Sequence, residues 1–299
     1  MKNYLTYPCK VMNITQGYTG NYSHGPHNEG SPKDYPWDEA CENTGRSPMY
    51  CPCDEMILKR KSFHRFKDIG NEKITEEELK EIENAFYSFT PLANDIKVKM
   101  KIVKDSTTCK VGQEYCILLY SEKKENYLQN IGYIGEQLDL YLVSRNIGTL
   151  WCGLAKTKEK QQNELEFVIM IAIAKVDSEA KFRTDLREAK RKEATAIWKG
   201  EAYSDIADVV RFAPSACNSQ PWIVDATEQE LKVYRDKKSA KFGILPFDVL
   251  KYMNQIDMGI FLCILELCLD KNQLNYQRTL FAEENIENNK LLTAVYKME

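Results

Sequence analysis

The sequence predicts a chain of mixed helix and sheet, in the α/β or α+β class, because strand-like and helix-like segments alternate from residue 56 onward. The order helix, strand, long helix, strand occurs twice, at a spacing of about 125 residues, which suggests an internal duplication. Residues 1–55 are instead rich in Gly, Pro, Asn, Tyr and Asp, without a sustained helical or strand period. We therefore expect a loop-rich appendage at 1–55 and one folded domain at 56–299, with halves at about 56–177 and 200–299.

The first repeat opens with a helix start. Thr75 offers a hydroxyl cap, and the acids of Glu76–Glu78 suit the first turn of a helix that should stop before Pro91. The other elements expected in this half are strands at Lys97–Val103 and Tyr115–Tyr120, a long amphipathic helix at Asn130–Arg145 and a buried strand at Phe167–Ala174.

The second repeat has the same order of elements. It comprises a helix at Ser204–Phe212, a hairpin of Pro221–Ala226 and Glu230–Arg235, a long helix at Asn254–Asp270, and strands near Tyr276–Ala282 and Leu291–Tyr296. No pair of segments is convincingly identical between the halves, so the duplication is inferred from the order alone.

The net charge and the hydropathy of the chain argue against nucleic acid and membranes as partners. The net charge is −3, which gives no global attraction to nucleic acid or to an anionic membrane. The most apolar segments, Phe167–Ala174 and Gly259–Leu269, are far shorter than the ~20 residues that cross a bilayer. Met1–Cys9 carries tyrosines and a proline where a signal peptide has its apolar run. We expect a cytoplasmic protein with a small-molecule substrate.

The segment Ala213–Trp222 has two prolines around small polar residues, at a junction between helix and strand. Such a rigid loop exposes groups that can bind the edge of a heteroaromatic ring, although turn chemistry alone also explains it. The decapeptide resembles the Ala-Pro-Ser-x-x-Asn-x-Gln-Pro-Trp signature of the nitroreductase family. In that family the Ser and Asn contact the flavin across a dimer interface, which implies flavin contacts from Pro214, Ser215 and Asn218 here.

A second segment, Arg60–Phe66, places basic side chains around a hydroxyl and could grip a phosphate, although most such runs are solvated surface. It resembles the family's Arg-Arg-Ser-x-Arg-x-Phe opening, which implies that Arg60, Lys61 and Ser62 hold FMN. His64 stands where the family has its third basic residue and Arg65 follows it, so either could reach the flavin.

A third segment, Asn146–Gly153, has glycines that permit close approach of a planar ligand. It is similar to the family's Leu-Gly-x-x-x-x-x-Gly loop, whose backbone amides face the N5 edge of the flavin, and this implies that role for Cys152 and Gly153. Cys152 could equally be a packing thiol. Lys190 and Arg191 lie where the family has a basic pair for the FMN phosphate, with a charged helix surface as the alternative.

The motifs are divided between the halves. The first half has the basic segment and the glycine loop, but it has Tyr87–Pro91 where Pro-Ser-x-x-Asn would stand. The second half has the Pro-Ser-x-x-Asn motif, but it has neither a basic segment nor a glycine loop. The resemblance, over roughly residues 56–299, therefore implies the single-chain, duplicated branch of the family: an α+β nitroreductase-like fold, a mixed central sheet flanked by helices, and a pseudo-dimer with one FMN. A monomer is expected, with a homodimer as the alternative.

The activity that this resemblance implies is electron transfer from a reduced nicotinamide, NADH or NADPH, through FMN to a nitroaromatic, quinone or similar small acceptor. The alternative is a catalytically inactive flavin-fold protein that binds a ligand or partner. No catalytic side chain and no metal ligand is assigned.

The N-terminal appendage invites a zinc interpretation through His24, His27, Asp34 and Asp38, which are similar to the opening of some lysostaphin-like metallopeptidase domains. Those domains need a later His-x-His pair, whereas the third and last histidine of this chain is His64. We expect a poorly ordered or degenerate appendage. The alternatives are a functional module, or a structural metal or disulfide cluster of Cys9, Cys41, Cys51 and Cys53.

Overall fold

The computed structural model describes residues 53–241 and 246–299. The expectations for the appendage, including the metallopeptidase resemblance and the cysteine cluster, fall on residues 1–55 and so lie almost entirely outside the described residues. Within the described ranges the chain is of mixed helix and sheet, as the sequence predicts.

The first half forms one antiparallel sheet with strand order β1-β2-β5-β3. The elements of this half are α3 (Cys53–Lys59), α4 (Glu76–Ser88), β1 (Val98–Val103), β2 (Tyr115–Ser121), α5 (Tyr127–Ser144), β3 (Ile147–Trp151), β4 (Gln161–Gln162), which pairs with β5, and β5 (Leu165–Lys175). The predicted start of α4 is confirmed: Thr75 and Glu78 form a reciprocal capping box.

The second half forms another sheet, with strand order β6-β7-β8-β10-β9. Its elements are α6 (Ala194–Ile197), β6 (Trp198–Lys199), α7 (Ser204–Val210), β7 (Trp222–Ala226), β8 (Glu230–Asp236), α8 (Phe247–Lys271), β9 (Tyr276–Ile286) and β10 (Lys290–Met298). The predicted hairpin is confirmed as the antiparallel pair β7–β8.

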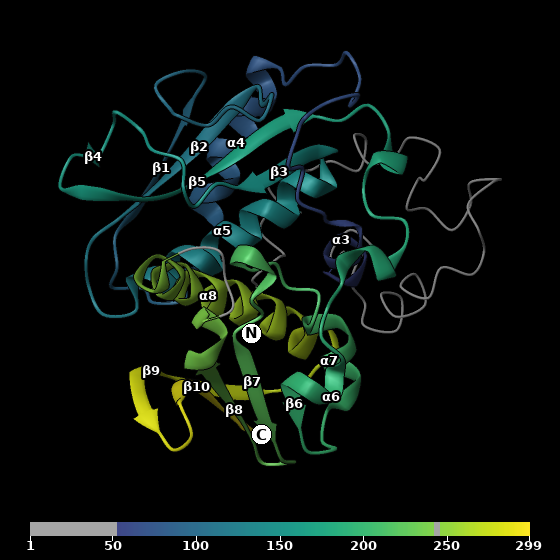
Figure 1. Ribbon diagram of the computed structural model, residues 1–299, viewed down its shortest axis with the longest axis vertical. Helices are drawn as coiled ribbons and strands as arrows, with labels where there is room; N and C mark the ends of the chain where they lie inside the picture. Colours follow the sequence, from purple (N-terminus) through teal and green to yellow (C-terminus); the bar gives the residue numbers. More distant parts are fainter. Residues whose placement is uncertain (1–52, 242–245) are drawn as a thin grey trace.

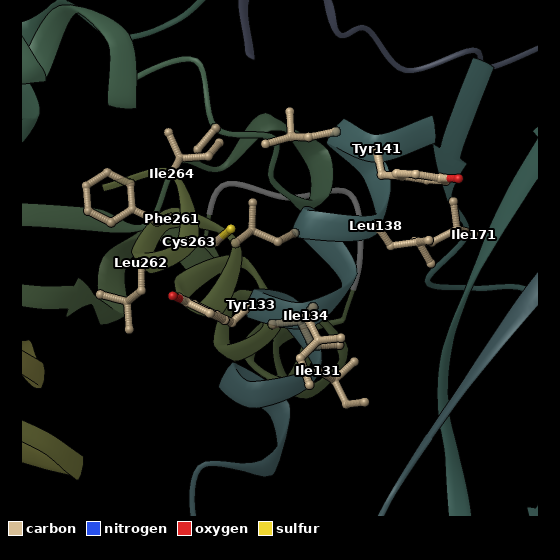
Figure 2. Close-up of a cluster of buried hydrophobic side chains, with 14 of the residues drawn as sticks. Ile131, Tyr133, Ile134, Leu138, Tyr141, Ile171, Phe261, Leu262, Cys263 and Ile264 are labelled. Atoms are coloured by element: carbon tan, nitrogen blue, oxygen red, sulfur yellow. The ribbon is translucent and has the colours of Figure 1, made fainter. Parts of the chain in front are cut away.

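The two long helices α5 and α8 lie between the sheets (Figure 1). Their apolar side chains fill the centre of the molecule, where Leu138 of α5 lies beside Ile171 of β5 and Phe261 extends from α8 (Figure 2). Two glycines let the helices touch. A Cβ atom on Gly132 would lie 2.0 Å from the Ile256 carbonyl oxygen, and one on Gly259 would lie 1.9 Å from that of Gln129.

Helix α8 is, by length and composition, the one described helix that could cross a membrane. In the fold, however, 89% of its most apolar 18-residue window is buried inside the protein. A helix that is apolar on all sides and covered on all sides is the core helix of a folded domain.

Several features differ from expectation. The resemblance implies one mixed central sheet flanked by helices, whereas the strands form two separate sheets with α5 and α8 between them (Figure 1). Strand β9 also extends to Ile286, beyond its predicted end near Ala282. Helix α5 begins at Tyr127 and α8 at Phe247, earlier than predicted. The predicted loop over 147–151 is the strand β3, which pairs with β5 along its whole length. Its glycine, Gly148, makes room for the Phe63 ring, 2.9 Å from where a Cβ would stand.

Candidate functional site

A cavity lies between the two halves. It encloses about 570 Å³ of empty space, including the solvent at its open mouth. Four stretches of chain line it, at 62–64, 150–153, 214–217 and along α8 at 253–260, with Ile169 of β5 beside them. Three of these stretches come from the segments that the sequence singles out.

The walls are mainly apolar. Leu150, Trp151, Ile169, Met253, Ile256 and Ile260 line the cavity. The Trp151 ring is fixed because its Nε1 donates to Asp139 Oδ2 at 2.8 Å. Gly153 keeps the space open, since a Cβ there would lie 2.5 Å from Met253 Cε. Facing apolar side chains with few polar groups suit a flat aromatic ligand.

The polar groups of the far wall belong to the loop that begins at Pro214. Ser215 Oγ accepts the Gln220 N–H at 2.9 Å, and the Ala216 N–H is 3.1 Å from both carboxyl oxygens of Asp257. Cys217 has a positive φ of 52° inside a 3-10 turn, Ala216–Asn218. The loop is therefore held in one shape by its own hydrogen bonds and by α8.

Arg60 lies in the core, 2% exposed, instead of in the cavity. Its Nε donates to Asp139 Oδ2 at 2.7 Å, and its Nη2 lies 3.4 Å from Ser62 Oγ. Burial would lower the Arg60 pKa, but the charges of Asp139 and Glu136 outweigh it and raise the pKa. Arg60 thus positions Ser62, which lines the cavity, from behind.

A group of cations, Arg60, Arg183 and Arg191, adjoins the cavity. Burial and the nearby Arg60 guanidinium lower the pKa of Arg183 to about 10 and that of Arg191 to about 9, although both groups stay charged at neutral pH. Arg60 is paired with Asp139, whereas no ion pair of Arg183 or Arg191 is seen among the described residues. Arg191 Nε is buried without a hydrogen-bond partner. Excess positive charge with an unused donor suits an anion.

The structure places Ser62, His64, Gly153, Pro214 and Ser215 on the cavity wall. Between His64 and Arg65, it is His64 that lines the cavity, although both are exposed.

The other predicted residues, Arg60, Lys61, Cys152, Lys190, Arg191 and Asn218, lie around the cavity without lining it. Lys61 Nζ lies 3.5 Å from the Phe182 carbonyl oxygen. The Cys152 N–H donates to Met170 O at 2.8 Å, so this amide is committed to the sheet. Asn218 accepts from Arg191 and donates to Lys190 O at 3.0 Å, which ties the loop to the cation group.

Sequence reasoning missed Asp257, Met253 and Arg183. Asp257 and Glu266 are two acids within the apolar run of α8, and this was a signal for Asp257, because a buried carboxyl needs a reason. Nothing local distinguishes Met253 from a core residue. Arg183 belongs to the basic run Lys181–Lys192, and the local excess of cations in this run was a signal that could have identified it.

Comparisons with known proteins agree with this geometry. A family model described as "Putative TM nitroreductase" matches residues 53–269. A solved structure from Thermotoga maritima MSB8, described as a "putative nitroreductase", has a TM-score of 0.53, covers 82% of this chain and 92% of that chain, and is 18% identical. At that identity the likeness shows the fold alone. The comparison with curated proteins found no match.

Proposed function

Because this chain belongs to that nitroreductase family, a family of oxidoreductases, we propose that it binds one FMN in the cavity and reduces a nitroaromatic, quinone or similar small acceptor with electrons from NADH or NADPH. The observation that carries the proposal is the meeting of the basic segment, the glycine loop and the proline-framed loop at one cavity. These segments are separated by up to about 150 residues of sequence, so their convergence is a property of the fold.

The residues present fit both the flat ring of FMN and its phosphate. The apolar side chains that line the cavity, Trp151 and Ile256 among them, suit the flat ring, and Ser62 and Ser215 offer hydroxyls for its polar edge. Arg183 and Arg191 supply the positive charge that a phosphate would neutralise. We propose that Arg191 holds the phosphate and that Asn218, its hydrogen-bond partner, orients it.

When bound, FMN accepts a hydride from a nicotinamide and passes two electrons to a second substrate. The role of the protein is to position the cofactor and the substrate and to exclude water from the cavity. Leu150, Met253 and Ile260 line the cavity with apolar surface, and His64 is the exposed polar group on its wall that an entering substrate could meet. Low polarity strengthens every hydrogen bond made there.

We also propose that the chain is an internal duplication that forms a pseudo-dimer. The order of strands supports it: β1-β2-β5-β3 in one sheet corresponds to β7-β8-β10-β9 in the other, and every neighbouring pair in both runs is antiparallel. In both halves the long helix follows the second of these strands. Gly132 and Gly259, 127 residues apart, make reciprocal contacts, as a two-fold axis requires.

The same offset of 127 residues relates a buried hydrogen-bond group in each half. Three pairs of residues correspond: Asp139 and Glu266, Thr149 and Tyr276, and Trp151 and Arg278. In the first half the acid accepts from the hydroxyl of the strand residue at 2.6 Å and from the Trp151 ring. In the second half the acid accepts from Tyr276 at 3.1 Å and from Arg278. Chance rarely reproduces such a group at one offset.

The symmetric position is filled by protein, which supports one flavin per chain. Arg278, the counterpart of Trp151, donates to Leu92 O at 2.7 Å and stacks on the Tyr133 ring, 5.7 Å from its centroid. The Ala93 N–H donates to Asn130 as the Ala216 N–H donates to Asp257, so Pro91 corresponds to Pro214. This is four residues later than the alignment of Tyr87 with Pro214 that the sequence motifs imply. With one complete site, a single chain is sufficient, and we propose that the monomer is active.

The test is reduction in the absence of oxygen. Protein reconstituted with FMN should be yellow, bleach with NADH or NADPH, and recover its colour when a quinone is added. The variant Gly153→Val should lose FMN because its side chain, or the Met253 side chain that it displaces, takes up space in the cavity that both residues line, whereas Arg65→Ala, an exposed neighbour of the site, should retain it. Protein that binds FMN and never bleaches would favour the inactive ligand-binding alternative. Protein that binds no FMN overturns the proposal.

A further inference from the structure

We propose that Asp257 holds, in its un-ionised carboxyl group, the proton that an acceptor takes up when it is reduced in the cavity. This inference rests on the proposed function, which supplies the electrons. It assigns a catalytic role to a residue outside the three sequence motifs.

The position of Asp257 makes the transfer possible. The residue extends from the middle of α8, is 4% exposed, and lines the cavity between Ile256 and Ile260. It is the sole carboxyl among the described residues of the cavity wall. A substrate stacked in the cavity would therefore meet this acid across apolar surroundings.

The hydrogen bonds around Asp257 favour the neutral acid. Its two oxygens share a single donor, the Ala216 N–H, at 3.1 Å each, whereas a buried carboxylate with a low pKa usually accepts two or three. Arg235 is the cation whose charge acts on Asp257 to lower its pKa, and it makes a bidentate pair at 2.5 Å with Glu283. Burial is the largest effect and raises the pKa of Asp257 well above its usual range.

The other half of the molecule shows what the fold requires at this position. The counterpart of Asp257, 127 residues earlier, is Asn130, whose Oδ1 accepts the Ala93 N–H at 3.0 Å. An amide therefore performs the same task of holding the loop. Asn130, at the position that protein fills in the first half, has no ionisable proton, whereas Asp257, at the open cavity, has one. Because either side chain can accept the loop N–H, holding the loop does not by itself require an acid, and the ionisable proton distinguishes Asp257 from Asn130.

The proton balance is complete for a quinone. The acceptor takes a hydride from the reduced cofactor and one proton from an Asp257 oxygen onto its carbonyl oxygen, giving the hydroquinone. Asp257 is left as a carboxylate and recovers a proton from water at the cavity mouth. The other titratable or charged groups facing it are His64 and Cys217 on the cavity wall and Arg235 with Glu283 behind it.

The first test needs no cofactor. Infrared difference spectra between the unmodified protein and Asp257→Asn should contain the carbonyl band of a protonated carboxyl at neutral pH, and that band should vanish only in alkaline solution. Asn keeps the acceptor for Ala216, as Asn130 does in the other half, so the variant should fold. A carboxylate band at neutral pH overturns the inference, whatever the flavin does.

The second test separates proton supply from electron supply. In FMN-loaded protein, Asp257→Asn should slow re-oxidation by a quinone roughly 100-fold or more, as loss of a general acid does. Re-oxidation by hexacyanoferrate(III), which takes an electron and no proton, should be unchanged. Equal slowing with both acceptors, or with neither, overturns the inference. Protein that never binds FMN instead refutes the proposed function and leaves the infrared result to decide the state of Asp257.

Discussion

The crossing of α5 and α8 gives the most quantitative prediction. In Gly132→Ala, the new Cβ would lie 2.0 Å from the Ile256 carbonyl oxygen, where ordinary contact begins at 3.4 Å, so the helices must separate by about 1.4 Å. Overpacking of a core typically costs about 1–3 kcal/mol. The contacted atom belongs to the backbone and cannot rotate away as a side chain can, so we take the upper end of this range, about 3 kcal/mol. The better helix propensity of Ala offsets about 1 kcal/mol of this cost. We expect a net loss of about 2 kcal/mol.

The assay is thermal and urea unfolding followed by circular dichroism. A loss of about 2 kcal/mol corresponds to a Tm lower by about 4–8 °C for a domain of this size. Gly259→Ala should behave alike, and the double variant should cost at least about 0.5 kcal/mol less than the sum, because one separation accommodates both methyl groups. Lys251→Ala, exposed on α8, is the control and should change stability by less than about 0.5 kcal/mol. A Gly132→Ala variant more stable than the unmodified protein, or a double variant whose loss equals the sum of the two single losses, would refute the reciprocal contact.

Three further predictions concern charges. Arg60→Ala should lower the free energy of unfolding by about 3–5 kcal/mol, because Asp139 is left buried without its cation, while Arg65→Ala should change it little; equal effects in urea unfolding would contradict this. Asn218→Ala should weaken FMN binding by about 1–3 kcal/mol and riboflavin binding much less, measured by titration of the apo-protein; an equal loss for both ligands would move the phosphate elsewhere. Burial alone would raise the pKa of Glu78, but hydrogen bonds from Lys175 and Thr75 lower it. The ionised Glu78 therefore stabilises the fold above the ordinary carboxyl range, and this stabilisation is lost as the pH falls through the lowered pKa. The difference in unfolding free energy between the unmodified protein and Glu78→Gln should shrink in acid, and a difference that grows would contradict this assignment.

The sequence predicted the elements whose signals are local. The Thr75 cap, the β7–β8 hairpin and the two long helices each follow from a few neighbouring residues. Strand β3 was missed because its glycine and its short length resemble a loop, and its pairing with β5 depends on residues well beyond the local window. The early start of α8 at Phe247, directly after Pro246, was also not predicted.

The candidate site divides in the same way. Ser62, Gly153 and Ser215 belong to short patterns and line the cavity. The burial of Arg60 could not be predicted, because its partner Asp139 is 79 residues away and nothing near either residue reveals the pair. Asp257 required the three-dimensional comparison of the two halves, since only its match with Asn130 separates a structural acceptor from an acid.

The ratio of FMN to protein chain tests the central claim most directly, namely that the two halves enclose a single flavin cavity. The absorbance spectrum of reconstituted protein, combined with the native mass, gives this ratio for a defined oligomer. We predict one FMN per chain in a monomer, because Arg278 occupies the symmetric position. Two FMN per chain, or none after reconstitution, would contradict the account.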